Sequence, residues 1–184
     1  MANGNFWSSV LSEPKRQHTF VVDIGTGQGG EGAVIPRFAV AAAKKPSAQI
    51  SEAEANWLNH TFYYPGKVKW DPIDFTFYDA VNPNVARALM KMLKDSGYYF
   101  PNKWIGTDET GKNAERTVSK KEAATAIGQV KITQLNHNGD PIETWTLKNP
   151  WFSKLNFGTL DYKSHEILTI EMTLRFDWAE PEVF

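Results

Sequence analysis

The residues from Ile170 to Trp178 alternate between apolar and polar side chains over nine positions. A period of two is the pattern of a β-strand that has one buried face. The apolar positions are Ile170, Met172, Leu174, Phe176 and Trp178. A strand this long and regular predicts a chain built around β-sheet, and no catalytic signature overlaps it.

Other segments repeat the β-strand pattern. We expect further strands over residues 18–24, 33–42, 57–64, 67–78, 126–135 and 141–148. The first two are separated by the glycine-rich residues 25–32, which predicts a hairpin. Asn138-Gly139 predicts a second tight turn. Residues 67–78 change apolar phase at Asp71-Pro72, and because proline cannot donate to a β-ladder we expect a bulge or bend there.

One helix is predicted after residue 82. Asn82 can cap it, and Pro83 suits the first helical position. Val85, Leu89 and neighbouring apolar residues form a stripe at helical spacing, and Gly97 suits the C′ position. The predicted fold class is therefore mainly β, an antiparallel β-sandwich or barrel with one flanking α-helix.

The chain of 184 residues suits one domain, 1–184. Within it we expect an N-terminal arm over 1–17, a long loop over 43–56, a polar flexible stretch over 111–122 and a loop over 149–163. Loops longer than about 12 residues in a compact domain are often functional, which draws attention to 43–56.

Charge and composition exclude several function classes. The chain has 20 basic and 21 acidic residues, for a net charge of −1, which gives no electrostatic attraction for phosphates or anionic lipids. It has no cysteine, so disulfides and thiolate metal sites are excluded. We see no secretory signal and no apolar run long enough to span a membrane, so no membrane insertion is expected.

The sequence offers no convincing catalytic, cofactor or metal site. Residues 25–30 fit the G-x-G-x-x-G pattern, but a strand with Pro36 follows where a dinucleotide site needs a helix. The four histidines lack ligand spacing, and no serine-nucleophile motif is present. The aromatic run from Trp57 to Tyr64 could stack single-stranded nucleic acid, although packing in a core or subunit interface is the favoured interpretation. We expect no enzyme.

Three stretches, in order, resemble the tail tube proteins of contractile-tail bacteriophages. The first is 15–24, with Phe20-Val21-Val22-Asp23-Ile24. The second runs from Lys44-Lys45-Pro46 through 57–65 to Trp70-Asp71-Pro72 and the helix start at Asn82. The third runs from Ile142 to Trp151, through Gly158-Thr159-Leu160-Asp161-Tyr162, to Trp178. Together they cover about three quarters of the chain, and the same fold is found in type VI secretion tube proteins.

The resemblance implies a virion structural protein, assembled in the host cytoplasm, whose hexameric rings stack into the inner tail tube that delivers genome DNA. It implies contacts with the tail sheath protein, baseplate tube initiator, tail terminator and tape-measure protein, and DNA passing without sequence-specific binding. An alternative is the baseplate tube initiator itself, or a tube subunit of a phage-like contractile injection system. A nucleotide enzyme using 25–30, a non-polymerising adaptor of the same fold and a single-stranded nucleic-acid binder remain open.

Two sets of residues are candidates for assembly. The loop 43–56 and the following aromatic run are the predicted ring-to-ring contact. Its candidate residues are Lys45, Pro46, Ser47, Ile50, Trp57, Phe62 and Tyr63. The polar face of the last strand is the candidate for the lumen or for inter-subunit strand pairing, and consists of Glu171, Thr173, Arg175 and Asp177.

Overall fold

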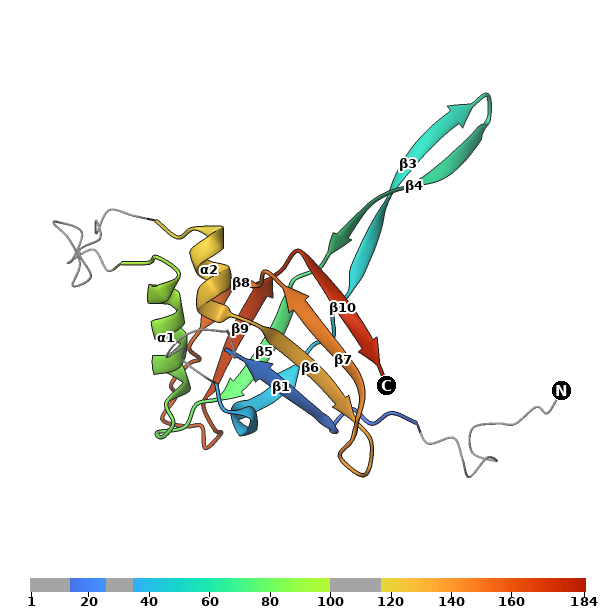
Figure 1. Ribbon diagram of the computed structural model, residues 1–184. Coiled ribbons are helices and arrows are strands. Elements are labelled where there is room, and N and C mark those ends of the chain that lie inside the picture. The colour runs from blue at the N-terminus through green and yellow to red at the C-terminus, as the bar shows by residue number, and fades with distance from the viewer. Residues whose placement is uncertain (1–13, 26–34, 100–116) are drawn as a thin grey trace.

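The computed structural model describes residues 14–25, 35–99 and 117–184, which form ten strands and two α-helices (Figure 1). The first part of the chain forms β1 (Phe20–Ile24), the short 3-10 helix η1 (Arg37–Ala39), β2 (Val40–Ala43), β3 (Ala48–Trp57), β4 (His60–Trp70), β5 (Ile73–Tyr78) and α1 (Val85–Asp95). The second part forms α2 (Lys120–Ile127), β6 (Val130–Leu135), β7 (Pro141–Lys148), β8 (Trp151–Asn156), β9 (Thr169–Arg175) and β10 (Trp178–Val183).

Two four-stranded antiparallel sheets form the body. Sheet A has the order β1-β6-β7-β10 and sheet B has the order β2-β5-β9-β8. The inner faces share one core with α1 and α2, which lie together at one flank (Figure 1). Strands β3 and β4 pair only with each other and project from the body as a hairpin. The predicted mainly-β antiparallel fold is confirmed.

The core follows the strand alternation. Ile73, Phe75 and Phe77 of β5 pair with Leu174, Met172 and Ile170 of β9, and all six are at most 1% exposed. Burying side chains of this size contributes roughly 1.5–3 kcal/mol each. This β5–β9 pair is the centre of sheet B and positions everything attached to its two ends.

The long terminal strand ends earlier than predicted. The alternation from 170 to 176 is buried as expected, but β9 ends at Arg175 and β10 begins at Trp178, in the other sheet. Trp178 is 44% exposed and is not part of the core face. The chain changes sheets across Phe176-Asp177, a break that alternation alone does not reveal.

The segment 43–56, predicted to be a long loop, is largely β3. Its alanines and glutamates have weak strand preference, so composition favoured a loop. The loop predicted over 149–163 also contains a strand, β8. The chain does bend at Asp71-Pro72, but the strands on the two sides, β4 and β5, belong to different sheets. Val68 of β4 therefore does not face the core and is 60% exposed.

The predicted hairpin between 18–24 and 33–42 is wrong in the described residues. Strand β2 pairs with β5 in sheet B, and Ile24 meets Ile35 in an isolated bridge. The turn at 25–32 lies outside the described residues from 26 onward. By contrast, the turn at Asn138-Gly139 joins β6 to β7 as predicted, with Gly139 at φ 87°.

The helices differ from prediction in number and in start. Asn84, not Asn82, caps α1, and its side chain accepts a hydrogen bond from the Arg87 amide at 2.6 Å. Helix α2 was missed because it is short and follows a charged stretch. Its signal is the capping box Ser119-x-x-Glu122, in which the Ser119 hydroxyl accepts from the Glu122 amide at 3.2 Å.

Candidate assembly site

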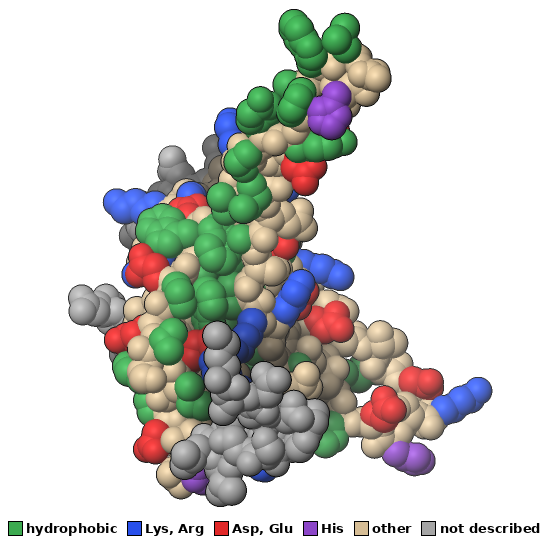
Figure 2. Space-filling view, turned by 90° about the vertical axis from the view of Figure 1, so that its right-hand side faces the viewer, with side chains coloured by type: hydrophobic (Ala, Val, Ile, Leu, Met, Phe, Trp, Pro, Cys, Tyr) green, Lys and Arg blue, Asp and Glu red, His purple; other side chains and the backbone are tan. Residues whose placement is uncertain are grey.

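The hairpin β3–β4 is highly exposed. Every residue of β3 is exposed, and hydrophobic side chains line the hairpin from its tip to the body (Figure 2). The pairing puts Ala53 opposite Tyr64, Ala55 opposite Phe62 and Trp57 opposite His60. Because side chains alternate across a strand, these pairs share one face, while Glu52 and Glu54 lie on the other. A hairpin standing alone in water is marginally stable, and within the described residues this one pairs with no further strand.

The hairpin is shaped by a bulge near its middle. The register shifts between Ile50 and Glu52, and the Ser51 hydroxyl accepts a hydrogen bond from the Lys67 amide at 2.8 Å. A Cβ at Gly66 would lie 2.4 Å from the Ser51 hydroxyl oxygen and 2.9 Å from its carbonyl oxygen, so only glycine fits there. The bulge increases the local twist and so sets the direction of the outer half.

The root of the hairpin is fixed to the body by polar and aromatic contacts. The Asp71 carboxylate accepts hydrogen bonds from Ser47 at 3.0 Å and from Gln49 at 3.3 Å. Trp70 packs on Phe176 with ring centroids 5.8 Å apart. The predicted contact residues therefore divide: Lys45, Pro46 and Ser47 lie at the root, whereas Ile50, Trp57, Phe62 and Tyr63 lie on the projecting part.

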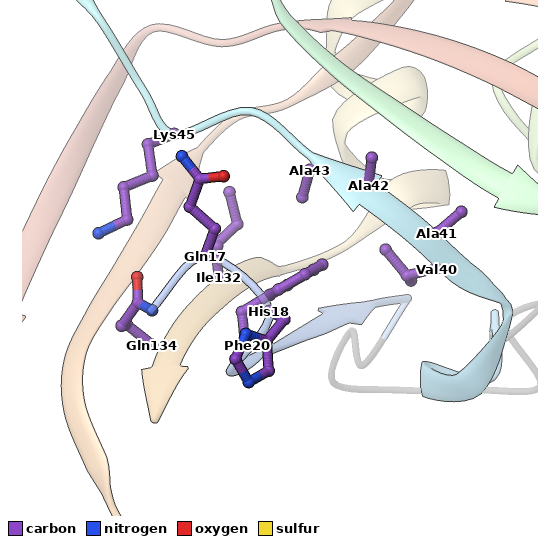
Figure 3. Close-up of a pocket in the computed structure, with 10 residues that line it drawn as sticks. All are labelled: Gln17, His18, Phe20, Val40, Ala41, Ala42, Ala43, Lys45, Ile132 and Gln134. Carbon is purple, nitrogen blue, oxygen red and sulfur yellow. The ribbon is translucent and has the colours of Figure 1, made fainter. Parts of the chain in front are cut away.

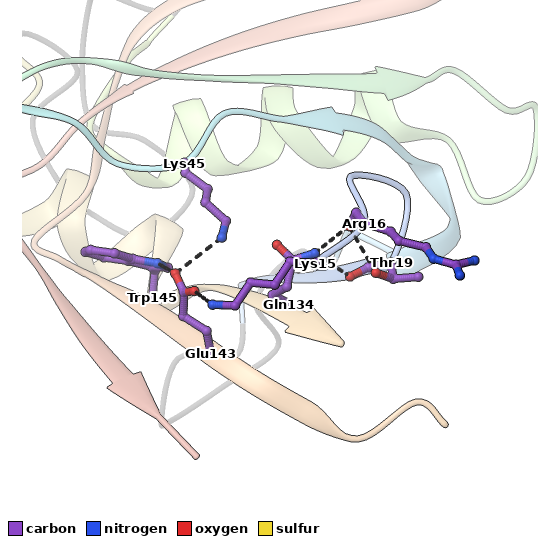
Figure 4. A network of polar contacts seen from close by, with 7 residues as sticks. All are labelled: Lys15, Arg16, Thr19, Lys45, Gln134, Glu143 and Trp145. Carbon is purple, nitrogen blue, oxygen red and sulfur yellow. Dashed lines mark hydrogen bonds and ion pairs between the residues drawn. The ribbon is translucent and has the colours of Figure 1, made fainter. Parts of the chain in front are cut away.

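A polar network beside the root links three segments (Figure 4). The Glu143 carboxylate accepts hydrogen bonds from Lys15 in the N-terminal segment, from Lys45 at 3.3 Å and from the Trp145 indole. Lys15, followed by Trp145 and Lys45, lowers the pKa of Glu143 to about 2. Gln134 holds the same N-terminal segment by donating to the Arg16 carbonyl at 2.6 Å. The end of the predicted arm 1–17 is thus tied to the body, and 1–13 lies outside the described residues.

A groove opens between the two sheets beside this network (Figure 3). It has a volume of about 770 Å³ and lies where end strand β1 of sheet A faces end strand β2 of sheet B. Phe20, Ile132 and the alanines of β2 supply its apolar walls, and Gln134 and Lys45 its polar rim. It contains no cluster of acids, bases or nucleophiles that indicates catalysis.

Three of the four polar residues of the last predicted strand lie on β9, and the fourth lies beyond its end. Glu171, Thr173 and Arg175 share the outer face of β9, where Thr173 donates to Asp74 at 2.7 Å and Glu171 accepts from Asn156 at 3.2 Å. Asp177 lies beyond the strand, where Lys120 of α2 at 2.7 Å and Asn149 at 2.8 Å donate to it. These two donors, Lys120 first, lower its pKa.

Trp57, Phe62, Tyr63 and Tyr64, the aromatic residues on which the nucleic-acid alternative rests, are all exposed on the hairpin. Across 14–25, 35–99 and 117–184, no group of three or more His, Asp or Glu side chains is placed to hold a metal. In the same ranges no helix has the length and apolarity needed to cross a membrane. Of the glycine motif at 25–30, Gly25 alone is described.

The fold and the projecting hairpin define the class: an antiparallel β-sandwich with an exposed β-hairpin extension. The T4-like virus tail tube protein gp19 family matches residues 16–180, and the chain belongs to that family. The resemblance to phage tail tube proteins is confirmed. No curated protein matches the sequence.

Solved structures with a similar fold include chains of the anti-feeding prophage and of an extracellular contractile injection system, PVC. A chain of the anti-feeding prophage tube-terminating cap is 16% identical, with 96% of this chain and 95% of that one covered and a TM-score of 0.64. A chain of the PVC sheath–tube complex in the extended state is 16% identical, with 95% of each chain covered and a TM-score of 0.62. A chain of the anti-feeding prophage baseplate is 16% identical over 94% and 98%, with a TM-score of 0.61. These likenesses show the fold.

Proposed function

We propose that this protein is the structural subunit of the inner tube of a contractile tail, forming hexameric rings that stack into a hollow tube for genome DNA. The observation that carries the proposal is the projecting hairpin, whose exposed aromatic face has no partner within the described chain. A monomeric protein rarely exposes a contiguous apolar surface of this kind. Membership of a tail tube family supplies the class of assembly.

The hairpin is the proposed ring-to-ring contact. Trp57 is 71% exposed and Phe62 47% exposed on one face, and Tyr63 is 63% exposed on the other. Both faces therefore offer large side chains to a neighbouring ring. Lys45, Pro46 and Ser47 at the root set the angle at which the hairpin leaves the body.

Within a ring, we assign the inter-subunit pairing to sheet B. Sheet A ends in β1 and in β10, and in β10 the Phe184 amide donates to the Ile142 carbonyl while Val183 is in register with Glu143. The backbone N–H groups of alternate β10 residues therefore point toward β7. Pro181 belongs to the other set, which points away from β7, and because proline has no N–H it interrupts the row of hydrogen-bond donors at this sheet edge. Edge strands blunted in this way resist further pairing. Sheet B ends in β2 and β8, which contain no proline.

The outer face of sheet B is then the proposed wall of the bore. Asp74 and Glu171 are matched there by Lys154 and Arg175, so the face has no net charge to trap DNA. Thr173→Lys places a cation in each subunit's wall and should make assembled tubes retain duplex DNA at low salt, in a salt-dependent manner. Unchanged DNA retention by well-formed tubes would contradict this assignment.

The proposed partners are further copies of the chain, the tail sheath, the baseplate tube initiator, the tail terminator and the tape-measure protein, in a virion assembled in the host cytoplasm. The alternative station is the baseplate initiator, or a tube of a phage-like injection system. The similar chains come from a cap, a tube complex and a baseplate, and because they share the fold alone they do not favour one station over another. A purified protein that grows into long tubes favours the tube, and single rings favour the initiator.

The test is electron microscopy of the purified protein beside a hairpin-shortened variant. Residues 51–67 are replaced by Asn-Gly, because Ile50 and Val68 are directly paired and a two-residue turn can join them. The wild type should form tubes with a central hole, and the variant should fold but form none. A full-length variant with Asn138-Gly139 exchanged for Asp-Gly is the matched turn control. Normal tubes from the shortened variant would overturn the stacking role.

A further inference from the structure

Many of the large exposed hydrophobic residues lie at two opposite poles of sheet B, and a smaller group lies on β10 of sheet A. In the β5–β9 pair, Ile73 is in register with Leu174 at one end and Tyr78 with Thr169 at the other. The hairpin joins the first end through Asp71-Pro72, and the β8–β9 loop joins the second through Leu168. Figure 1 shows the hairpin and that loop pointing away from each other.

We call these surfaces the hairpin pole and the loop pole. The hairpin pole is made of Ile50, Trp57, Leu58, Phe62, Tyr63 and Tyr64. The loop pole is made of Phe38, Val81, Leu160, Tyr162 and Ile167. All five side chains of the loop pole are at least 69% exposed, which is unusual for residues of this size.

The loop pole is a built surface. The Asp79 amide donates to the Leu168 carbonyl at 3.0 Å, which ties the segment before α1 to the β8–β9 loop. Asp161 accepts from the Lys163 amide at 2.9 Å, and a Cβ at Gly158 would lie 2.6 Å from the Thr169 carbonyl oxygen. Its apolar side chains are therefore presented on an ordered backbone.

We propose, resting on the tube function above, that the loop pole is the receptor for the hairpin pole of a second copy. Contact between unlike ends of identical subunits repeats without limit, whereas like-to-like contact stops at a dimer. The exposed side chains of the hairpin pole amount to roughly 800 Å², about one side of a standard protein interface. The outer half of the hairpin carries Glu52 and Glu54, whereas the loop pole exposes Lys163 beside Asp161 and Glu166. Charge therefore does not select this contact, and the apolar side chains of the two poles carry it.

The natural absence of cysteine makes the contact testable by disulfide cross-linking. Trp57→Cys and Leu160→Cys variants are purified separately, mixed, assembled and oxidised. The mixed pair should cross-link about tenfold more than either variant alone, because assembly raises the effective concentration of the two thiols. Glu182→Cys, on exposed β10 away from both poles, is the control partner for Trp57→Cys. A second pair, Leu58→Cys with Tyr162→Cys, repeats the test with Trp57 and Leu160 intact, in case their loss weakens the contact.

Electron microscopy of the same samples separates the two ideas. Tubes without the Trp57–Leu160 cross-link, or with equal cross-linking to position 182, would overturn the receptor assignment and leave the tube function standing. Efficient cross-linking of Trp57→Cys with itself would indicate like-to-like contact and overturn the assignment as well. Absence of any rings or tubes from the wild type would overturn both proposals.

Discussion

The sandwich body and the hairpin follow opposite rules within one chain. In the body, Phe75, Phe77 and Leu89 are completely buried, whereas in the hairpin Trp57 and Leu58 are 71% and 92% exposed. The inner faces of the two sheets bury their large side chains in one core, whereas the large side chains on the projecting part of the hairpin pack against no core within the described residues. The comparison predicts that core substitutions change stability and that hairpin substitutions change the proposed assembly, largely independently of each other.

The largest effect on stability is expected in the body. Phe75→Ala removes a fully buried ring that stacks with Phe77 at 6.3 Å and should lower the free energy of unfolding by about 3–5 kcal/mol. Urea denaturation followed by tryptophan fluorescence measures it. Phe75→Leu, which keeps most of the volume, should cost much less. Equal losses in the two variants would contradict a packing origin.

An intermediate effect is expected at the junction of body and hairpin. The pKa of Glu143 is lowered to about 2 in the folded protein, so its stabilisation is present above its usual pKa of 4.5 and is lost as pH falls toward 2. Glu143→Gln should therefore lower the free energy of unfolding at pH 6 by roughly 1–2 kcal/mol, after allowance for screening, and leave it unchanged near pH 2.

Chemical denaturation at several pH values tests this dependence. Glu182→Gln, a change of the same kind at an exposed site on β10, is the control and should show little pH-dependent difference. A wild-type to Glu143→Gln difference that stays constant from pH 6 to pH 2 would refute the role of the carboxylate charge.

A smaller effect is expected at the α2 contact. Lys120→Ala removes the ion pair with Asp177, whose partners are both partly exposed, and should cost up to about 1 kcal/mol. Thermal unfolding in low and high salt measures it. Salt screens exposed charges, and the screening length in 1 M salt is roughly 3 Å. The difference in stability between variant and wild type should therefore be smaller in 1 M salt than in low salt. A salt-independent loss would indicate a packing effect instead.

The smallest effect on stability, with a large effect on assembly, is expected at the hairpin. Trp57→Ala should change the free energy of unfolding by less than about 0.5 kcal/mol, because the side chain is exposed. The protein concentration needed for tube formation should rise at least about tenfold, as for loss of an interface anchor. Sedimentation across a concentration series measures it, with Trp57→Tyr as the conservative control. A Trp57→Ala protein that is destabilised but assembles at the wild-type concentration would contradict this prediction.

The body could largely be predicted from the sequence, and the assembly surfaces only in part. The alternation at 170–176 and the turn at Asn138-Gly139 have strong local signals, and both predictions are confirmed. Strand β3 has alternating alanine and glutamate, a pattern whose apolar side is small because large residues lie opposite, on β4. That cross-strand division cannot be read from one strand. Likewise, nothing local to Trp178 indicates that the chain crosses to the other sheet after Phe176.

The hairpin also has a mechanical consequence. A two-stranded ribbon whose first strand, β3, has ten residues extends about 33 Å and is fixed to the body at one end, through Asp71 and Trp70. Such a ribbon bends and twists more easily than the packed sandwich behind it. A filament whose subunits are joined by ribbons of this kind can bend under load, because the ribbons deform while the contacts between subunits are kept.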